Sequence, residues 1–117
     1  MKIYISLPIS GIEFEQVYAS TVFATVALER KGHTAIDPLD VCGAVGDEMD
    51  YAACMGRDIE ALLRCDAIVL LDGWKQSKGC QLERKAAELY GLQVFEGLNK
   101  VPESTALWHI FGKEEDV

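Results

Sequence analysis

Apolar residues along the chain fall into short continuous runs that alternate with longer stretches of helical spacing. The runs show little alternation with polar residues, which fits strands that are covered on both faces. They comprise residues 2–7, 33–36, 66–71 and 92–95. The stretches between them repeat apolar residues every three or four positions, which is typical of helices with one buried face. These predicted helices cover residues 14–28, 52–64 and 82–89.

Individual residues define the expected ends and buried faces of the helices. Ser10 and Glu13 form an S-x-x-E capping box that is predicted to start the first helix, and Gly32 is predicted to stop it. The residues expected to be buried are, helix by helix, Phe14, Val17, Thr21, Ala24 and Leu28; Ala52, Met55, Ile59 and Leu62; and Leu82, Ala86 and Leu89. Residues 39–46 are predicted to form a loop, and residues 104–111 could form a short helix.

The alternation of strands and helices predicts an α/β fold, a three-layer sandwich around a parallel sheet of the Rossmann-like or flavodoxin-like kind. Four or five strands are expected, with the order 2-1-3-4 for the four recognised, and residues 1–117 are expected to form one domain. In such sheets ligands bind beyond the carboxyl ends of the strands, where the winding direction reverses. The loops that follow Leu7 and Leu71 are therefore expected to lie side by side and to form the site.

Composition narrows the possible partners. Eleven Lys and Arg face nineteen Asp and Glu, for a formal net charge of -8, so binding to a nucleic acid polymer or an anionic membrane surface is not expected. No apolar run approaches the roughly 20 residues that span a bilayer, and a cytoplasmic protein is expected. The four cysteines contain no C-x-x-C pair and the histidines are not placed beside them, which predicts reduced thiols and no metal site.

Small and polar residues dominate the two loops of the predicted site. The candidates for substrate binding are Ser6, Pro8, Ser10, Gly11, Asp72, Trp74, Ser77, Lys78 and Gly79. Ser77 and Gly79 precede a helix, whose backbone amides could hold an anion, although a turn with a helix cap would have the same sequence. Trp74 could stack on a planar base or simply cover the end of the sheet.

Two acidic residues are candidate catalytic residues. Glu83 follows Gly79 by one helical turn and flanks the apolar stripe of its helix, so it is placed near the ligand. Asp58 has a similar place beside Ile59 on the preceding helix. A carboxylate in such a position can serve as nucleophile or general base, and a solvated surface residue is the other interpretation.

The order of several short segments resembles a known family. They are Tyr4-Ile5-Ser6-Leu7-Pro8-Ile9-Ser10-Gly11, then Asp58, then Cys65-Asp66-Ala67-Ile68-Val69-Leu70-Leu71, then Ser77-Lys78-Gly79-Cys80-Gln81-Leu82-Glu83. Together they resemble the nucleoside 2-deoxyribosyltransferase-like superfamily, and most of all its small members and the 2'-deoxynucleoside 5'-phosphate N-hydrolases. The resemblance implies a glutamate nucleophile at Glu83, an aspartate near sugar and base at Asp58, and a tyrosine at Tyr4 that orients the glutamate. It also implies a phosphate contact at Ser77.

The expected function is cleavage or exchange of the base of a nucleoside or nucleoside 5'-monophosphate, with no cofactor. The resemblance also implies a homodimer whose sites are completed by the adjacent chain, with Ser104 as a phosphate contact. Gln81 stands where the family commonly has glycine, and the first loop lacks the arginine of the hydrolases. A nucleotide-binding module without turnover is therefore the alternative, and a partner-binding protein is a third possibility.

Overall fold

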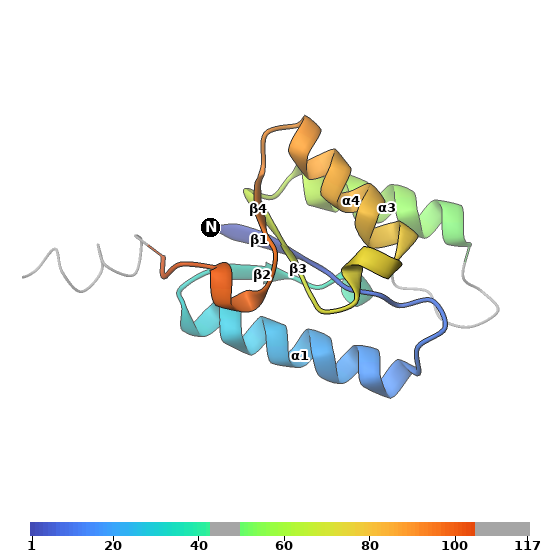
Figure 1. The fold of residues 1–117 in the computed structure, drawn as a ribbon, viewed down its shortest axis with the longest axis horizontal. Coiled ribbons are helices and arrows are strands. Elements are labelled where there is room, and N and C mark those ends of the chain that lie inside the picture. Colours follow the sequence, from blue (N-terminus) through green and yellow to red (C-terminus); the bar gives the residue numbers. More distant parts are fainter. Residues whose placement is uncertain (43–49, 105–117) are drawn as a thin grey trace, which may run out of the picture.

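The computed structural model describes residues 1–42 and 50–104 (Figure 1). Its strands are β1 (Lys2–Ser6), β2 (Thr34–Ile36), β3 (Ala67–Leu70) and β4 (Gln93–Phe95). Its helices are α1 (Phe14–Arg30), α2 (Pro38–Cys42), α3 (Tyr51–Leu63) and α4 (Lys78–Leu89), with 3-10 turns η2 (Trp74–Gln76) and η3 (Leu98–Lys100). The described strands form one parallel sheet in the order β2-β1-β3-β4, which confirms the predicted fold class and strand order.

The sheet separates two apolar cores, because successive side chains of a strand point to opposite faces. On one face Ile3 and Ile5 pack against α1, and on the other Tyr4 packs with residues from α3, β3 and α4. Figure 1 shows α1 below the sheet and α3 and α4 above it, so the molecule has three layers. No helix in the described part of the chain is long and apolar enough to cross a membrane.

The first helix differs from its prediction at its amino end. Four residues of the predicted stripe are buried: Val17, Thr21, Ala24 and Leu28. Phe14, however, is 58% exposed. The capping box is also wrong, because Glu13 itself occupies the cap position and its side chain makes no capping hydrogen bond. Gly11, with a φ of 78°, forms a left-handed turn that separates Ser10 from the start of the helix.

The buried faces of α3 and α4 differ in part from the predicted ones, although the predicted Leu62 is buried. On α4 the exposed fractions of Leu82 and Leu89 are 52% and 69%. The residues buried on these two helices are Cys54, Asp58 and Leu62, and Cys80, Glu83 and Ala87. A carboxylate can occupy a buried face when it receives hydrogen bonds there, whereas an exposed leucine is common in folded proteins. Glu83 therefore lies on the buried face of α4 and not beside it.

The segment after β2 is not entirely the loop that the sequence predicts, because residues 38–42 form α2. Cys42 at the end of α2 forms a disulfide with Cys54 on α3, so the expectation of reduced thiols is wrong for this pair. Cys65 and Cys80 are buried free thiols, as expected. The helix predicted for residues 104–111 lies, after Ser104, outside the described residues.

Candidate active site

A cavity of about 890 Å³ opens at the carboxyl ends of β1, β2 and β3. This is a suitable size for a small-molecule ligand. Nine of the thirteen predicted site residues line it: Tyr4, Pro8, Ser10, Asp58, Asp72, Ser77, Lys78, Gly79 and Glu83. The structure therefore brings the two predicted loops and both candidate carboxylates to one cavity.

Glu83 is held by two hydroxyl groups of the central strand. The Tyr4 hydroxyl donates to Oε2 at 2.7 Å, and the Ser6 hydroxyl donates to Oε1 at 2.6 Å. Tyr4 and Ser6 are two positions apart on β1, so their side chains point to the same face of the sheet. Both are buried, and Glu83 is 5% exposed. The carboxylate is thus fixed at the cavity by donors that have little freedom of their own.

Burial also raises the pKa values of Glu83 and Tyr4. It raises the pKa of Glu83 to about 7, against the opposing effect of the hydrogen bonds from Ser6 and Tyr4. The nearby charge of Asp58 raises it further. The pKa of Tyr4 is raised as well, first by burial and then by the Glu83 charge, so Tyr4 stays a neutral donor. A glutamate with a pKa near neutrality can act as a nucleophile or exchange a proton at physiological pH.

Asp58 is the second carboxylate of the cavity and lies on α3. Its side chain is 8% exposed, and burial raises its pKa to about 6. Its Oδ1 atom is buried and has no hydrogen-bond partner among the described residues. Because an unsatisfied buried oxygen is costly, a water or a ligand in the cavity would be stabilised by donating to it.

The second loop is tied to the first and leads into α4. Gly73 has a φ of 90°, and a Cβ atom added there would lie 3.1 Å from Cγ of Pro8, so the two loops meet closely at this point. Ser77 caps α4, since its Oγ accepts the Cys80 amide at 3.2 Å. The helix-cap interpretation of Ser77 is therefore confirmed. Its side chain also lines the cavity, where the amino end of α4 favours an anion or a polar group.

Four predicted site residues do not line the cavity: Ser6, Gly11, Trp74 and Ser104. Ser6 acts on it through Glu83, as described above. Trp74 packs against the core between the sheet and α4. The Arg84 guanidinium lies 5.3 Å from the centroid of the Trp74 ring. Ser104 donates its amide to the carbonyl of Lys31, just before β2, so it lies towards the amino ends of the strands.

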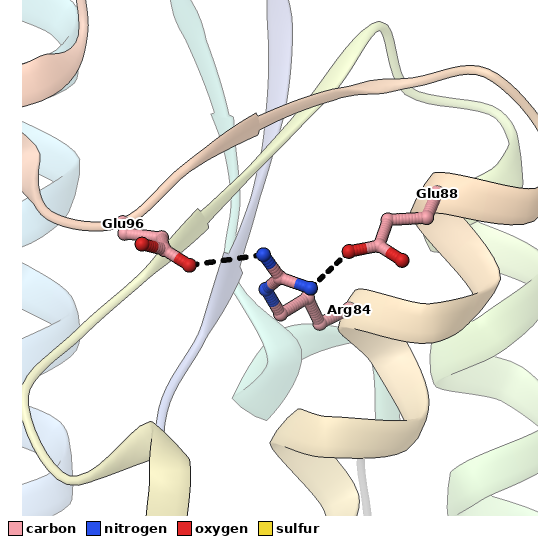
Figure 2. Close-up of polar contacts among 3 residues, drawn as sticks. All are labelled: Arg84, Glu88 and Glu96. Carbon is pink, nitrogen blue, oxygen red and sulfur yellow. Dashed lines mark hydrogen bonds and ion pairs between the residues drawn. The ribbon is translucent and has the colours of Figure 1, made fainter.

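Arg84 follows Glu83 in sequence and is directed away from the cavity. Figure 2 shows its guanidinium between Glu88, one turn further along α4, and Glu96, just after β4. It pairs with both carboxylates, with a distance of 3.0 Å to Glu96. Arg84 therefore connects α4 to the segment after β4 and does not line the cavity.

Several cavity residues were not anticipated from the sequence. Asp37 and Asp40 follow β2, Phe14 and Tyr18 come from the first two turns of α1, and Tyr51 begins α3. The signal for Asp37 was present, because it ends a predicted strand next to a proline at the ligand-binding edge of the sheet. The aromatic residues carried no such signal, since apolar residues at helical spacing are first assigned to a core.

Comparisons with known proteins concern the family and the fold of the chain. The profile of a protein family described as a domain of unknown function (DUF4406) matches residues 1–96. A search of curated proteins found no significant match. Among solved structures, the CMP N-glycosidase of Clostridium botulinum has a TM-score of 0.56 at 20% identity, over 80% of this chain and 68% of that chain.

Two further structures are 2-deoxyribosyltransferases. The protein from the psychrotolerant bacterium Bacillus psychrosaccharolyticus has a TM-score of 0.62 at 21% identity, over 80% of this chain and 69% of that chain. The protein from Leishmania mexicana has a TM-score of 0.60 at 18% identity, and 61% of its length is covered by 80% of this chain. These likenesses show that the chain shares its fold with an N-glycosidase and with 2-deoxyribosyltransferases.

Proposed function

Because the chain belongs to the DUF4406 family and shares its fold with an N-glycosidase and with 2-deoxyribosyltransferases, we propose that it is an enzyme acting on N-glycosidic bonds. The proposed substrate is a nucleoside or a nucleoside 5'-monophosphate, whose base is cleaved off or exchanged. The observation that carries the proposal is the buried Glu83 carboxylate, which two hydroxyl groups hold at the cavity.

The proposed reaction proceeds through a covalent intermediate. Glu83 attacks the anomeric carbon of the sugar through an oxocarbenium-like transition state, and the bond to the base breaks. Tyr4 and Ser6 fix the direction of attack, since each holds one carboxylate oxygen. Asp58, or a water that it binds, assists departure of the base by hydrogen bonding or protonation. Water or a second base then releases the sugar, and no step needs a metal or an organic cofactor.

The residues around the amino end of α4 are proposed to hold the 5' end of the substrate. Ser77, Lys78 and Gly79 line the cavity there. A helix amino end and an ammonium group both favour a phosphate, and the same groups also accept a 5'-hydroxyl. Comparing nucleosides with their 5'-monophosphates therefore belongs in the first experiment.

The proposal predicts that purified protein releases free base from at least one member of a panel of nucleosides and 5'-monophosphates. Chromatography of the reaction mixture measures the base, and addition of a second free base distinguishes exchange from hydrolysis. If calorimetry detects binding of panel members but no base is released, the result would contradict an enzymatic function and favour a nucleotide-binding module. Absence of both binding and release would favour a partner-binding protein.

A homodimer is also proposed, because α1 presents an apolar surface that adjoins the cavity. Its exposed residues are Phe14, Tyr18, Val22, Phe23 and Val26. Contiguous exposed apolar side chains commonly mark a protein interface. Ser104 could contribute to a cavity only from a neighbouring subunit, since in its own chain it lies towards the opposite edge of the sheet.

The dimer is expected to be visible by light scattering at tens of micromolar protein. Phe23→Glu, which places a charge at the most exposed of these positions, is expected to shift the protein to a monomer. Leu89→Glu is the matched control, because Leu89 is equally exposed but lies on α4. A monomeric wild-type protein with activity that is unchanged on dilution would contradict the shared site.

A further inference from the structure

The cavity carries an excess of negative charge. Within the described part of the chain, the only cationic side chain that lines it is Lys78. The acidic residues that line it are Asp37, Asp40, Asp58, Asp72 and Glu83. Carboxylates gathered around a concave surface create a negative potential that attracts cations and repels a phosphate.

The neighbouring arginines do not offset this charge, because each is bound elsewhere. Arg84 pairs with Glu88 on α4 and with Glu96, which follows β4 (Figure 2). Arg57 on α3 donates to the carbonyl oxygen of Cys42 at 3.0 Å. Neither guanidinium lines the cavity. For a bound phosphate, the attraction of Lys78 and of the amino end of α4 would therefore be opposed by the acidic side chains that line the cavity.

Asp58 shows where a positive group would be most favourable. Its side chain is more than nine-tenths buried, it lines the cavity, and its Oδ1 atom has no hydrogen-bond partner among the described residues. A buried carboxylate oxygen in this state gains from a neighbouring cation or donor. Glu83, the other buried carboxylate, already has a donor on each oxygen.

Aromatic rings line the same cavity as the carboxylates. Phe14 and Tyr18 are stacked, with ring centroids 6.1 Å apart and an interplanar angle of 25°, and Tyr51 lies at the start of α3. Aromatic faces bind flat rings, and they bind cationic groups with additional electrostatic attraction. Rings and carboxylates together therefore suit a flat, positively charged group.

We propose that the site selects N-ribosides or N-deoxyribosides whose base carries a positive charge, such as pyridinium ribosides, with an uncharged 5' end. The inference rests on the proposed function for its chemistry and on the cavity charges for its selectivity. The charged ring would lie among the aromatic side chains, with Asp58 beside the glycosidic nitrogen.

Such a substrate also simplifies the reaction. When Glu83 forms an ester bond to the anomeric carbon, the bond from that carbon to the ring nitrogen breaks, and its electron pair neutralises the cationic ring. The base leaves as a neutral molecule and needs no proton. Water then cleaves the ester, which gives the free sugar, the Glu83 carboxylate and one proton. Asp58 can therefore remain ionised and stabilise the bound cation.

Calorimetry on the full chain can separate charge from shape with two nearly identical probes. Nicotinamide riboside carries a positive ring, and dihydronicotinamide riboside is its neutral reduced form. Glu83→Gln protein is used for binding so that turnover does not consume the probes. The cationic probe is expected to bind at least tenfold more tightly than the neutral one. Nicotinamide mononucleotide, which adds a 5'-phosphate, is expected to bind more weakly than nicotinamide riboside.

Variants test the origin of the preference. In the same background, Asp58→Asn is expected to reduce the cation preference several-fold, whereas Glu60→Gln should not change it. Glu60→Gln is the matched control because this substitution removes a negative charge on the exposed side of the same helix. A preference that survives Asp58→Asn unchanged would contradict the role given to Asp58.

The outcomes for charge selection and for catalysis are distinguishable. If neutral nucleosides release base and both nicotinamide probes bind equally, charge selection is wrong and the proposed function stands. If the cationic probe is preferred and no substrate releases base, charge selection stands and the proposed function is wrong. Tighter binding of the mononucleotide than of the riboside would overturn the uncharged 5' end.

Discussion

Glu83→Gln is expected to reduce turnover by roughly 10⁴-fold or more, the scale on which loss of a nucleophile acts in other enzymes. Glutamine has nearly the same shape but cannot form the covalent ester with the sugar. Single-turnover release of base measures the effect, because it reports the chemical step and not product release. Glu60→Gln, at a surface position of α3, is expected to keep wild-type activity. Full activity of the Glu83→Gln protein would refute the role of Glu83 as the nucleophile.

The same variant is expected to be folded, and more stable than the wild-type protein above pH 7. Burial raises the pKa of Glu83 from its usual 4.5 to about 7, so the folded state favours the protonated form. The stability that this contributes is present below about pH 4.5 and is lost as the pH rises through 7. The amide does not ionise, so its advantage in unfolding free energy should grow by roughly 3 kcal/mol over that interval. Urea unfolding at pH 5 and pH 8 measures the change.

The activity of the wild-type protein is expected to fall about tenfold for each pH unit below about 7. Only the ionised form of Glu83 attacks the sugar. Its pKa of about 7 therefore sets the pH below which the acidic limb of the pH–activity profile falls. The measurement is kcat/KM against pH with a substrate that does not titrate in this range. A limb near pH 4.5 would show that the reacting carboxylate is an ordinary solvated one.

Tyr4→Phe is expected to move this limb to higher pH, because it removes a hydrogen bond that stabilises the ionised carboxylate. Activity at pH 7 should therefore fall more than activity at pH 9. Tyr90→Phe is the matched control, since Tyr90 is exposed at the end of α4. An equal loss at every pH would indicate that Tyr4 acts on packing and not on the charge of Glu83.

Strand order and the location of the site could be predicted from the sequence for a simple physical reason. Parallel strands buried on both faces appear as continuous apolar runs, of which residues 67–70 are the clearest, and their carboxyl ends must share one edge. The loops after β1 and β3 were therefore correctly placed together. Most candidate site residues came from these loops and from the carboxylates beside the apolar stripes, while Tyr4 and Ser104 came from the resemblance; their roles remain predictions.

The buried face of α4 could not be predicted, because apolar pattern alone assigns leucine to the core and glutamate to the surface. In α4 the hydroxyl donors of the sheet reverse this assignment for Leu82 and Glu83, and only the fold brings those donors to the helix. The disulfide between Cys42 and Cys54 was missed for a similar reason. Pairing depends on the distance and direction of two side chains, which a sequence spacing of 12 does not fix.

The alternation along β1 divides one short strand between two tasks. Ile3 and Ile5 belong to the core under α1, while Tyr4 and Ser6 hold the carboxylate on the other face. The odd positions of this strand therefore serve packing alone, whereas Tyr4 serves both the second core and the site. Substitutions at Ile3 or Ile5 that keep the packing against α1 are therefore expected to leave both hydroxyl donors of Glu83 in place.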